Sequence, residues 1–383
     1  MMRILLYNAQ GGGIDSPYEE FVATLANDLS TSFEVVAVHS AKEMGDHPLN
    51  EFQLVHVFGC WNTAATALLL RAESKNIPTV LSPLGGLQPW HIRQHQQQWQ
   101  RRRQRQTAEK ASAVHVCGQL ERDTFEKLGW NKKVVTIKNP IFTSLISHDE
   151  CARQFVSLYR KVIDSNAARL LREKSRQAMG QLLQLGIDDF VLHDTERIDN
   201  LKALLPTLTE EDWRLMTLYA ADEHVLGPMG LGLQRVGYPL PELNVNEIDR
   251  FPSEAKYVEG HLKADALLSR NLLMKSRLHD YVYEKEKSER KLAIMIANLR
   301  YEMEHQSAPL LHLLDLYEVL RFEDVDEDRL VEILKIIAIE GFAAHIMGVT
   351  HRVLGLTEGF MPMSPKDDKE TTLMVRAITK FSI

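Results

Sequence analysis

Glycines follow a short apolar run near the start of the chain, where their chemistry suits a phosphate-bearing ligand. Gly11, Gly12 and Gly13 come directly after the apolar run Arg3–Ala9. Glycines let a ligand approach the backbone closely, and the amides at the start of a following helix favour a phosphate. The run has no G-x-G-x-x-G or Walker pattern, so a plain turn with positive φ angles explains it equally well.

Aromatic residues and further glycines follow two later runs. Val55–Trp61 is a strand-like segment that closes on Trp61, and an aromatic ring at a strand end can stack on a sugar face. His56, inside the run, is expected to be a hydrogen-bonded core histidine. The segment Val80–His91 reads VLSPLGGLQPWH. It places two glycines and a tryptophan just beyond another strand-like run.

These residues need a scaffold, and the first 145 residues alternate strand-like and helical stretches. The apolar runs are Arg3–Ala9, Phe33–His39, Leu54–Phe58, Thr79–Leu81, Ala113–Val116 and Val134–Ile137. Stretches with helical spacing lie between them, at Tyr18–Leu29, Thr63–Ala72 and Leu120–Leu128. Such alternation predicts an α/β domain over residues 1–145, with a parallel six-stranded sheet covered by helices on both faces.

Beyond this domain the pattern is mostly α-helical. We expect a mixed, mainly helical region over residues 146–260 and a helical region over 261–383. Apolar residues stand at helical intervals in Gln154–Leu185, and the predicted helices are Glu210–Tyr219, Gln306–Arg321 and Asp328–Met347. Ala264–Arg300 is predicted to be one long helix or two stacked ones. Phe190–Leu192 is predicted to be a short strand. Gly227–Pro241, which has four glycines and three prolines, is predicted to be a loop or hinge.

Composition limits the classes of function. The 383 residues are 44% hydrophobic and 25% charged, which is typical of a globular protein with two or three domains. The net charge of -7 argues against a nucleic-acid partner. Three cysteines without C-x-x-C spacing indicate neither a disulfide framework nor a zinc site, and favour a cytoplasmic protein.

Other segments carry weaker signals. The N-terminal apolar run is too short for a signal peptide, and charged residues interrupt Ile333–Val349, which is expected to be a buried helix rather than a membrane span. Scattered histidines predict no metal site. Asp188 and Asp189 are interpreted as solvated loop carboxylates.

Taken in order, the motifs over residues 3–143 resemble the acceptor-side domain of family 4 glycosyltransferases of the GT-B type. The matching segments are the glycine run, VHVFGCW, IPTVLSPLGGLQPWH and LERDTFEKLGWNKKVVTIKNPIFT. The resemblance implies a Rossmann-like domain, a nucleotide-diphosphate sugar as donor substrate near Gly11–Gly13, and no cofactor or metal. It also implies a glycan or lipid-linked acceptor. The implied acceptor-side residues are Trp61, Gly85, Gly86, Trp90 and Arg93.

The chain departs from this family in two places. Leu84 stands where the family has a histidine beside the transferred sugar, and leucine can neither donate a hydrogen bond nor stabilise charge. The spacing of His91 does not support it as a replacement. The family's donor-binding domain, with its lysine and two glutamates, is not recognisable. Glu332 and Glu340 have the right separation but fall in one predicted helix, so we interpret the match as coincidence.

Residues 93–110 are rich in arginine and glutamine. The arginines are Arg93, Arg101, Arg102, Arg103 and Arg105. In family members that act on lipid-linked acceptors, this region contacts an anionic bilayer, which here would place the protein peripherally at the inner face of the membrane. A solvated helix face that pairs with acidic residues is the alternative.

Two functional hypotheses follow. The first is a glycosyltransferase of the hexosyltransferase type, which transfers a sugar from a nucleotide-diphosphate sugar to a glycan or lipid-linked acceptor. The second is a catalytically inactive relative that keeps the sheet as a scaffold and binds a protein partner through its helical half. A small α/β unit within residues 183–260 that faces the glycine run would favour the first, and an all-helical segment that points away from it would favour the second.

Overall fold

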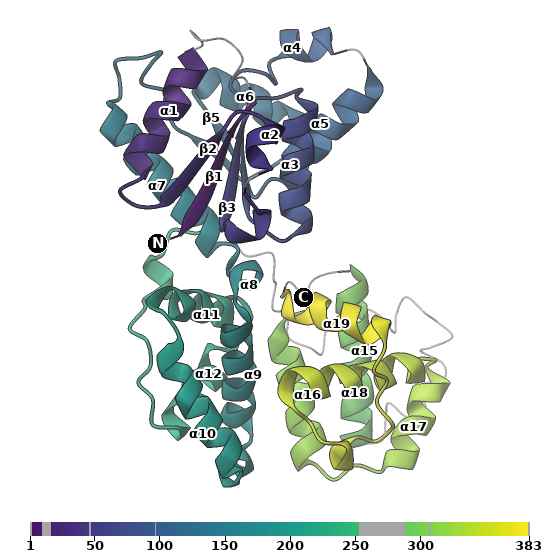
Figure 1. Ribbon diagram of the computed structural model, residues 1–383. Coiled ribbons are helices and arrows are strands. Elements are labelled where there is room, and N and C mark those ends of the chain that lie inside the picture. The colour runs from purple at the N-terminus through teal and green to yellow at the C-terminus, as the bar shows by residue number, and fades with distance from the viewer. Residues whose placement is uncertain are drawn as a thin grey trace. The chain divides into compact units, whose positions relative to one another are not determined.

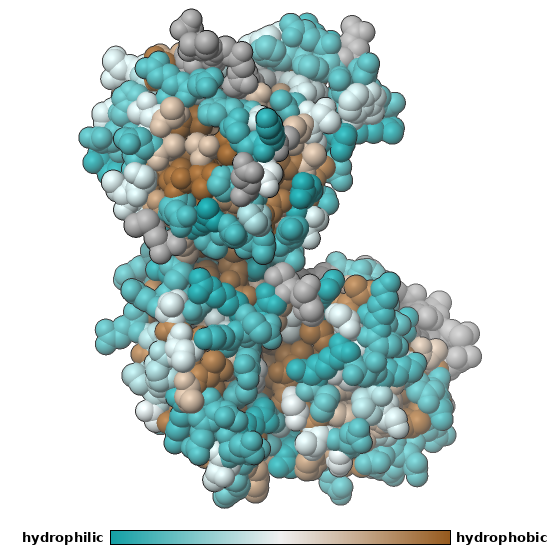
Figure 2. Space-filling model, in the orientation of Figure 1, coloured by the Kyte–Doolittle hydropathy of each residue, from teal (hydrophilic) through white to brown (hydrophobic). Residues whose placement is uncertain are grey.

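The computed structural model describes residues 2–9, 17–45, 47–95, 97–252, 288–305 and 308–381. Contacts divide the chain into two compact units, shown in Figure 1. The sheet unit comprises Met1–Leu170 and Ile248–Pro252, and the helical unit comprises Leu171–Glu247 and Ser253–Ile383. The predicted glycine site, Gly11–Gly13, lies outside the described residues. Figure 2 shows that hydrophilic residues cover most of the visible face of each unit.

The sheet unit contains a six-stranded parallel sheet in the order β2-β1-β3-β4-β5-β6, which confirms the predicted fold class. The strands are β1 (Arg3–Asn8), β2 (Glu34–Val38), β3 (Leu54–Phe58), β4 (Thr79–Ser82), β5 (Ala113–Val116) and β6 (Val134–Thr136). In register, Leu5 of β1 pairs with Val36 of β2 and Val55 of β3. Because all strands are parallel, their carboxyl ends meet at one edge of the sheet, called here the carboxyl edge.

Helices cover both faces of this sheet, as Figure 1 shows. The helices of the unit are α1 (Pro17–Leu29), α2 (Ala41–Met44), α3 (Thr63–Ser74), α4 (Pro89–Gln94), α5 (Gln98–Lys110), α6 (Gln119–Leu128), α7 (His148–Asp164) and α8 (Ala167–Leu170), with a 3-10 turn η1 (Leu49–Glu51). Helix α1 packs against α7, and α3 packs against α5. Alternate strand residues, such as Leu5 and Val55, form one apolar core with Leu68 and Leu69 of α3.

The described residues of the helical unit form helices and no strand. They are α9 (Glu173–Ile187), η2 (Asp189–His193), α10 (Thr195–Leu204), η3 (Leu205–Thr207), α11 (Glu210–Asp222), α12 (Leu226–Arg235), η4 (Val245–Glu247), α15 (Ser288–His305), α16 (Leu310–Phe322), α17 (Glu327–Ile336), α18 (Glu340–Leu354), η5 (Glu358–Phe360) and α19 (Lys369–Thr379). The mostly helical character predicted for this half is therefore confirmed. Of the predicted helix Ala264–Arg300, residues 264–287 lie outside the described residues.

The predicted strand at Phe190–Leu192 is wrong, because these residues form the 3-10 turn η2. The Asp188 carboxylate caps this turn by accepting a hydrogen bond from the Phe190 amide at 3.0 Å. Asp188 is buried rather than solvated. Its other oxygen accepts hydrogen bonds from the Tyr317 hydroxyl at 3.2 Å and from Arg321 Nε at 2.7 Å, which joins the end of α9 to α16.

The predicted loop or hinge at Gly227–Pro241 is also wrong over its first part, where α12 forms. The glycines there allow close packing of helices rather than flexibility. A Cβ added to Gly232 would overlap the Leu182 carbonyl of α9, and one added to Gly186 of α9 would overlap the Pro228 carbonyl. The two helices therefore cross backbone against backbone.

The single helix predicted over Asp328–Met347 is two helices, α17 and α18. Ala338 lies between them with φ of 59°, and the Ile339 amide donates a hydrogen bond back to the Leu334 carbonyl at 2.9 Å. Ile337 and Ile339 bury their side chains, which holds the chain in this bend. Glu340 thus begins α18, while Glu332 lies inside α17.

Candidate functional site

The loops at the carboxyl edge are joined by hydrogen bonds. The Ala9 amide, after β1, donates to the Phe58 carbonyl of β3 at 2.8 Å. The Gly59 amide, after β3, donates to the Ser82 carbonyl of β4 at the same distance, 2.8 Å. Three neighbouring strands therefore end together, and their loops form a continuous rim.

Trp61 and Gly86, both predicted acceptor-side residues, meet at this rim. The Trp61 indole Nε1 donates a hydrogen bond to the Gly86 carbonyl at 2.6 Å, and its ring stacks on His95 at 4.2 Å between centroids. The Trp61 backbone amide donates to Gln104 Oε1 of α5 at 2.8 Å. The indole N–H is thus used inside the protein, while part of the ring remains accessible.

Gly85 and Gly86 have different local roles. A Cβ on Gly86 would lie 2.9 Å from Cys60 Cβ, so a glycine lets the loops after β3 and β4 pack together. Gly85 has φ of 78°, which a residue with a side chain rarely adopts. Leu84 beside it buries its side chain, with 7% exposed. It packs into the protein and offers no polar group to a ligand.

Glu121, which the sequence reasoning did not select, joins two loops of the rim. One carboxylate oxygen accepts a hydrogen bond from the Gly85 amide at 2.7 Å, and the other accepts from the Cys117 amide at 2.8 Å. Burial raises the pKa of the Glu121 carboxyl, and the two amide hydrogen bonds oppose that rise. Its position in the LERDTFEKLGW segment, which carries part of the family resemblance, is the signal that the sequence offers.

Trp90 and Arg93 lie on α4, directly after the glycine loop. They stand three residues apart and therefore share a helix face. Both are exposed, and 54% of the Trp90 surface is accessible. The structure therefore brings Trp61, Gly85 and Gly86 together by hydrogen bonds within the rim and leaves Trp90 and Arg93 on the helix that follows it.

Large exposed hydrophobic residues of the sheet unit follow the carboxyl ends of strands. Trp90 and Trp99 come after β4, Leu120 comes after β5, and Phe142 and Leu145 come after β6. Phe142 packs edge-on against Tyr18 of α1, with 5.5 Å between centroids. We call these five residues the apolar rim.

The arginines of α5 divide into two groups. Arg101 donates hydrogen bonds to the His95 and Ile92 carbonyls at 2.6 and 3.1 Å, and Arg105 pairs with Glu109 at 2.7 Å. Arg102 and Arg103 are exposed. Arg103 lines a hollow of about 20 Å³ with Trp61 and Trp99, which has room for one water molecule.

Beneath the rim, four buried side chains form a hydrogen-bonded chain. Tyr159 Oη lies 2.6 Å from His56 Nδ1, and His56 Nε2 lies 2.7 Å from Ser82 Oγ. Ser82 Oγ lies 2.6 Å from His115 Nδ1, whose other nitrogen lies 3.0 Å from the Ile137 carbonyl. That carbonyl can only accept, so one set of tautomers satisfies every member of the chain.

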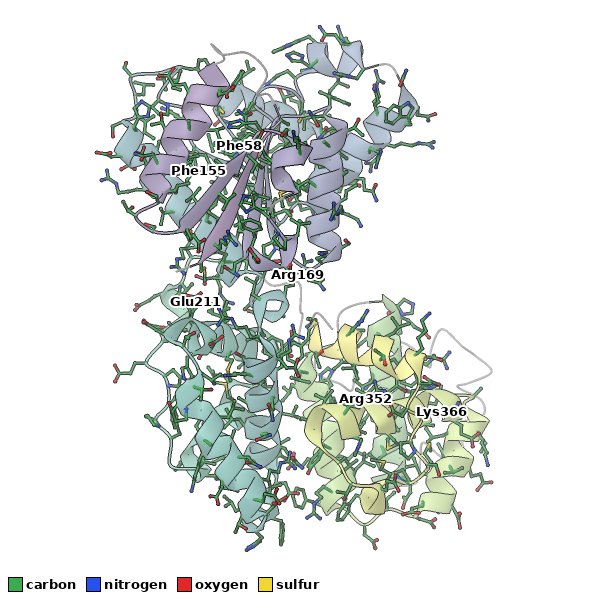
Figure 3. All side chains as sticks on the ribbon, in the orientation of Figure 1. Phe58, Phe155, Arg169, Glu211, Arg352 and Lys366 are labelled. Carbon is green, nitrogen blue, oxygen red and sulfur yellow. The ribbon has the colours of Figure 1, made fainter. Side chains whose placement is uncertain are left out.

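Apolar neighbours keep the two histidines of this hydrogen-bonded chain uncharged. The centroid of the Phe58 ring of β3 lies 3.8 Å from that of His56, and the Phe155 ring of α7 lies 4.8 Å from that of His115; Figure 3 labels both phenylalanines. Burial lowers the pKa of His115 to about 4 and lowers the pKa of His56 well below its ordinary value. The expectation that His56 is a satisfied core histidine is confirmed.

No described helix combines the length and the apolar character that a membrane crossing requires. Within the same residues, no three histidine, cysteine, aspartate or glutamate side chains gather closely enough to hold a metal ion.

Comparison with known proteins agrees with the architecture of the sheet unit. Residues 21–140 match the family model for the glycosyl transferase 4-like domain. The match runs from α1 to the loop after β6, so it includes the loops that carry Trp61, Gly86 and Glu121. No curated protein and no solved structure matches the chain. The N-terminal part of this protein is therefore a family 4-like glycosyltransferase domain of the GT-B type.

Proposed function

We propose that the carboxyl edge of the sheet unit binds a glycan or lipid-linked acceptor in a glycosyltransferase-type reaction. In that reaction an acceptor hydroxyl bonds to the anomeric carbon of a nucleotide-diphosphate sugar. The bond from that carbon to the diphosphate breaks, and the hydroxyl proton leaves to a base or to solvent. The observation that carries the proposal is the rim itself, where Trp61, Gly85, Gly86 and Glu121 are fixed by hydrogen bonds within a glycosyl transferase 4-like domain.

The apolar rim and the arginines support an amphiphilic, anionic acceptor. Trp90 and Trp99 are exposed near Arg93, Arg102 and Arg103, and tryptophan and arginine together suit the interface between lipid headgroups and water. The acceptor would then be presented at the inner face of a membrane, with the protein bound peripherally. Leu120 and Phe142 would extend the apolar contact along the same edge.

Calorimetric titration of the full chain with UDP, GDP and their hexose conjugates tests the donor side of this proposal. We expect saturable binding that is lost in Gly12→Trp, because a bulky side chain would block approach to the glycine run. Gly230→Ala, in the helical unit, serves as the control and should bind normally. Unchanged binding by a folded Gly12→Trp variant would show that the glycine run is not the donor site.

A second candidate function is a catalytically inactive relative in which the sheet unit still binds an acceptor. Two observations favour it. Leu84 is buried where the family has a histidine, and the described residues 171–247 are helical without a strand. In this case the helical unit would serve as the surface for a protein partner.

One pair of measurements separates the two candidates. Vesicles that contain an anionic phospholipid are mixed with the wild-type chain, with Trp90→Ala and with Trp213→Phe as a control outside the edge. Sedimentation with vesicles that requires Trp90, together with nucleotide-sugar binding, supports the transferase. The same sedimentation without any nucleotide binding supports the inactive relative, and equal sedimentation of all three variants contradicts the proposed membrane contact of the edge.

A further inference from the structure

Three phenylalanine rings of the helical unit meet around one arginine. Phe190 lies in η2, Phe322 ends α16 and Phe360 ends η5. Their ring centroids lie 5.3, 5.4 and 4.1 Å from Arg321 Cζ, in that order. Three segments that are far apart in the sequence therefore bring aromatic side chains to one place, which we call the phenylalanine cluster.

The rings of the phenylalanine cluster are accessible to a partner. Phe190 is 59% exposed, Phe322 is 46% exposed and Phe360 is 37% exposed. Single exposed apolar residues are ordinary on a protein surface, but apolar residues that gather at one place mark a site of interaction. The cluster is therefore a candidate docking surface.

Arg321 holds the rings in place while its own charge is balanced inside the protein. Its Nε atom donates a hydrogen bond to the buried Asp188 carboxylate at 2.7 Å, and 20% of its side chain is accessible. Cation–π contacts join the guanidinium to all three rings. Side chains that are already ordered lose less conformational entropy when a partner binds, so these rings suit the role of anchor points.

Each phenylalanine of the cluster has an exposed carboxylate within two residues of it in the sequence. These carboxylates belong to Asp189, Asp324 and Glu358. Among the residues that the structure describes, their side chains have no hydrogen-bond or ion-pair partner. The surface around the cluster therefore offers negative charges that a partner can pair with.

The carboxylates distinguish between three kinds of occupant. A second copy of the chain, joined through the same surface, would bring carboxylates against carboxylates, which repel one another. An anionic membrane would meet the same negative charge. A protein segment with lysine or arginine beside a large apolar side chain complements both the rings and the carboxylates.

We propose that the phenylalanine cluster docks a segment of a partner protein in which a large apolar side chain is flanked by lysine or arginine. The apolar side chain packs on the three rings, and the flanking cations pair with the three carboxylates. Exposed charge pairs add little affinity each and mainly select the partner, so the rings supply most of the binding. The surface belongs wholly to the helical unit, so the proposal does not depend on a donor or acceptor site in the sheet unit.

Selection from a library of random peptides displayed on phage tests the proposal, with the full chain as bait. Enriched peptides should combine a large apolar residue with lysine or arginine. In fluorescence anisotropy, such a peptide should bind about tenfold more weakly to Phe190→Ser and to Phe360→Ser. Leu373→Ser changes a leucine of α19 that is 54% exposed, and this matched control should bind the peptide as the wild type does.

A second variant tests the carboxylates without changing the rings. Asp189→Asn combined with Glu358→Gln should weaken binding of the same peptide about fivefold at low salt, and should reduce the dependence of affinity on salt. The urea midpoint should match that of the wild type, because these carboxylates pair with no described residue. Glu210→Gln, on the exposed start of α11, is the control and should change neither affinity nor salt dependence.

The outcomes separate this surface from the sheet unit and from the other occupants. Basic peptides that lose affinity in the ring and carboxylate variants but keep it in Trp90→Ala support the proposal. Selection that enriches no basic peptide, or a basic peptide that Phe190→Ser and Phe360→Ser bind as tightly as the wild type, overturns it. Self-association in sedimentation velocity, or binding to anionic vesicles, also overturns it if Phe190→Ser abolishes that interaction, since the cluster would then serve a second copy or a membrane.

Discussion

The centre of the sheet unit and the crossing of α9 and α12 in the helical unit bring their elements together by opposite means. In the sheet unit, side chains that can hydrogen-bond cross the core, from Tyr159 of α7 through His56 and Ser82 to His115. In the helical unit, side chains are missing at the crossing point, so that the backbones of α9 and α12 touch at Gly186 and Gly232. The contrast concerns these two places: the centre of the sheet unit depends on polar atoms with partners, and the crossing of α9 and α12 depends on the absence of side chains.

This difference determines which substitutions each unit tolerates. A hydrogen-bonded chain withstands small changes of volume but not the loss of one partner, because the remaining polar atoms stay buried. A helix crossing at glycine withstands changes of polarity nearby but not an added atom, because the neighbour is a backbone carbonyl that cannot rotate away. Each unit can therefore be tested with a substitution that would matter little in the other.

Gly232→Val should have the largest effect. The new side chain would overlap the Leu182 carbonyl, so α12 must move away from α9. We expect the free energy of unfolding of the helical unit to fall by about 4 kcal/mol. Urea denaturation followed by circular dichroism at the helical band measures this change.

Gly230→Ala, two residues away on the same helix, is the control. A Cβ there would meet only Leu240 Cδ1, at an ordinary distance of 3.6 Å. Alanine favours a helix over glycine, so stability should rise by up to about 1 kcal/mol. If Gly232→Val were as stable as Gly230→Ala, backbone contact would not hold this crossing together.

The crossing of α9 and α12 also shows which features could be predicted from the sequence and which could not. The strands of the sheet unit could be predicted because each is a short apolar run bounded by turn residues, and the glycines of the rim followed from their positions at strand ends. Glycine and proline in Gly227–Pro241 have the same local preferences whether they end a helix or allow two helices to touch. Only the position of Leu182 in space distinguishes these cases.

The prediction of the candidate site from the sequence had the same limit. Trp61 and Gly86 could be selected by type and by position, and they do meet at the rim. Glu121 lies in the LERDTFEKLGW segment that carries the family resemblance, but its hydrogen bond to the Gly85 amide depends on how the loops after β4 and β5 meet in space. Asp188 was misjudged for a related reason, since its partner Arg321 lies far away in the sequence.

Ser82→Ala should have the next largest effect, in the sheet unit. It leaves His56 Nε2 and His115 Nδ1 buried without their shared partner, and we expect a loss of about 3 kcal/mol. Trp213 is the one tryptophan of the helical unit, so fluorescence in a Trp213→Phe background reports on the sheet unit. Ser112→Ala is the control, because it leaves only the Thr79 amide without its partner and should cost about 1 kcal/mol. Equal losses in the two variants would argue against a coupled chain.

Over the range from pH 6.5 to 5, the smallest effect is a dependence on pH, at most about 2 kcal/mol from His115, that should separate the two units. His115 has a folded pKa of about 4, and an unfolded histidine titrates near 6.5, so the unfolded state binds a proton first as the pH falls. The contribution of His115 is complete above about pH 6.5 and is lost toward pH 4, at up to about 1.4 kcal/mol per pH unit. His56 adds to this slope, while Glu121, whose pKa is raised, opposes it.

In the helical unit, burial raises the pKa of Glu223, so its effect has the opposite sign. A carboxyl with a raised folded pKa loses stability as the pH rises through that value and regains it as the pH falls. As the pH falls from 6.5 to 5, the urea midpoint of the sheet unit should decrease. Tryptophan fluorescence in the Trp213→Phe background measures this midpoint. The urea midpoint of the helical unit should stay level or rise. It is measured from the fluorescence of Trp213, which is the difference between the signals of the wild type and of Trp213→Phe. If the urea midpoints of both units decreased in parallel, the buried His56 and His115 would give the sheet unit no acid sensitivity of its own.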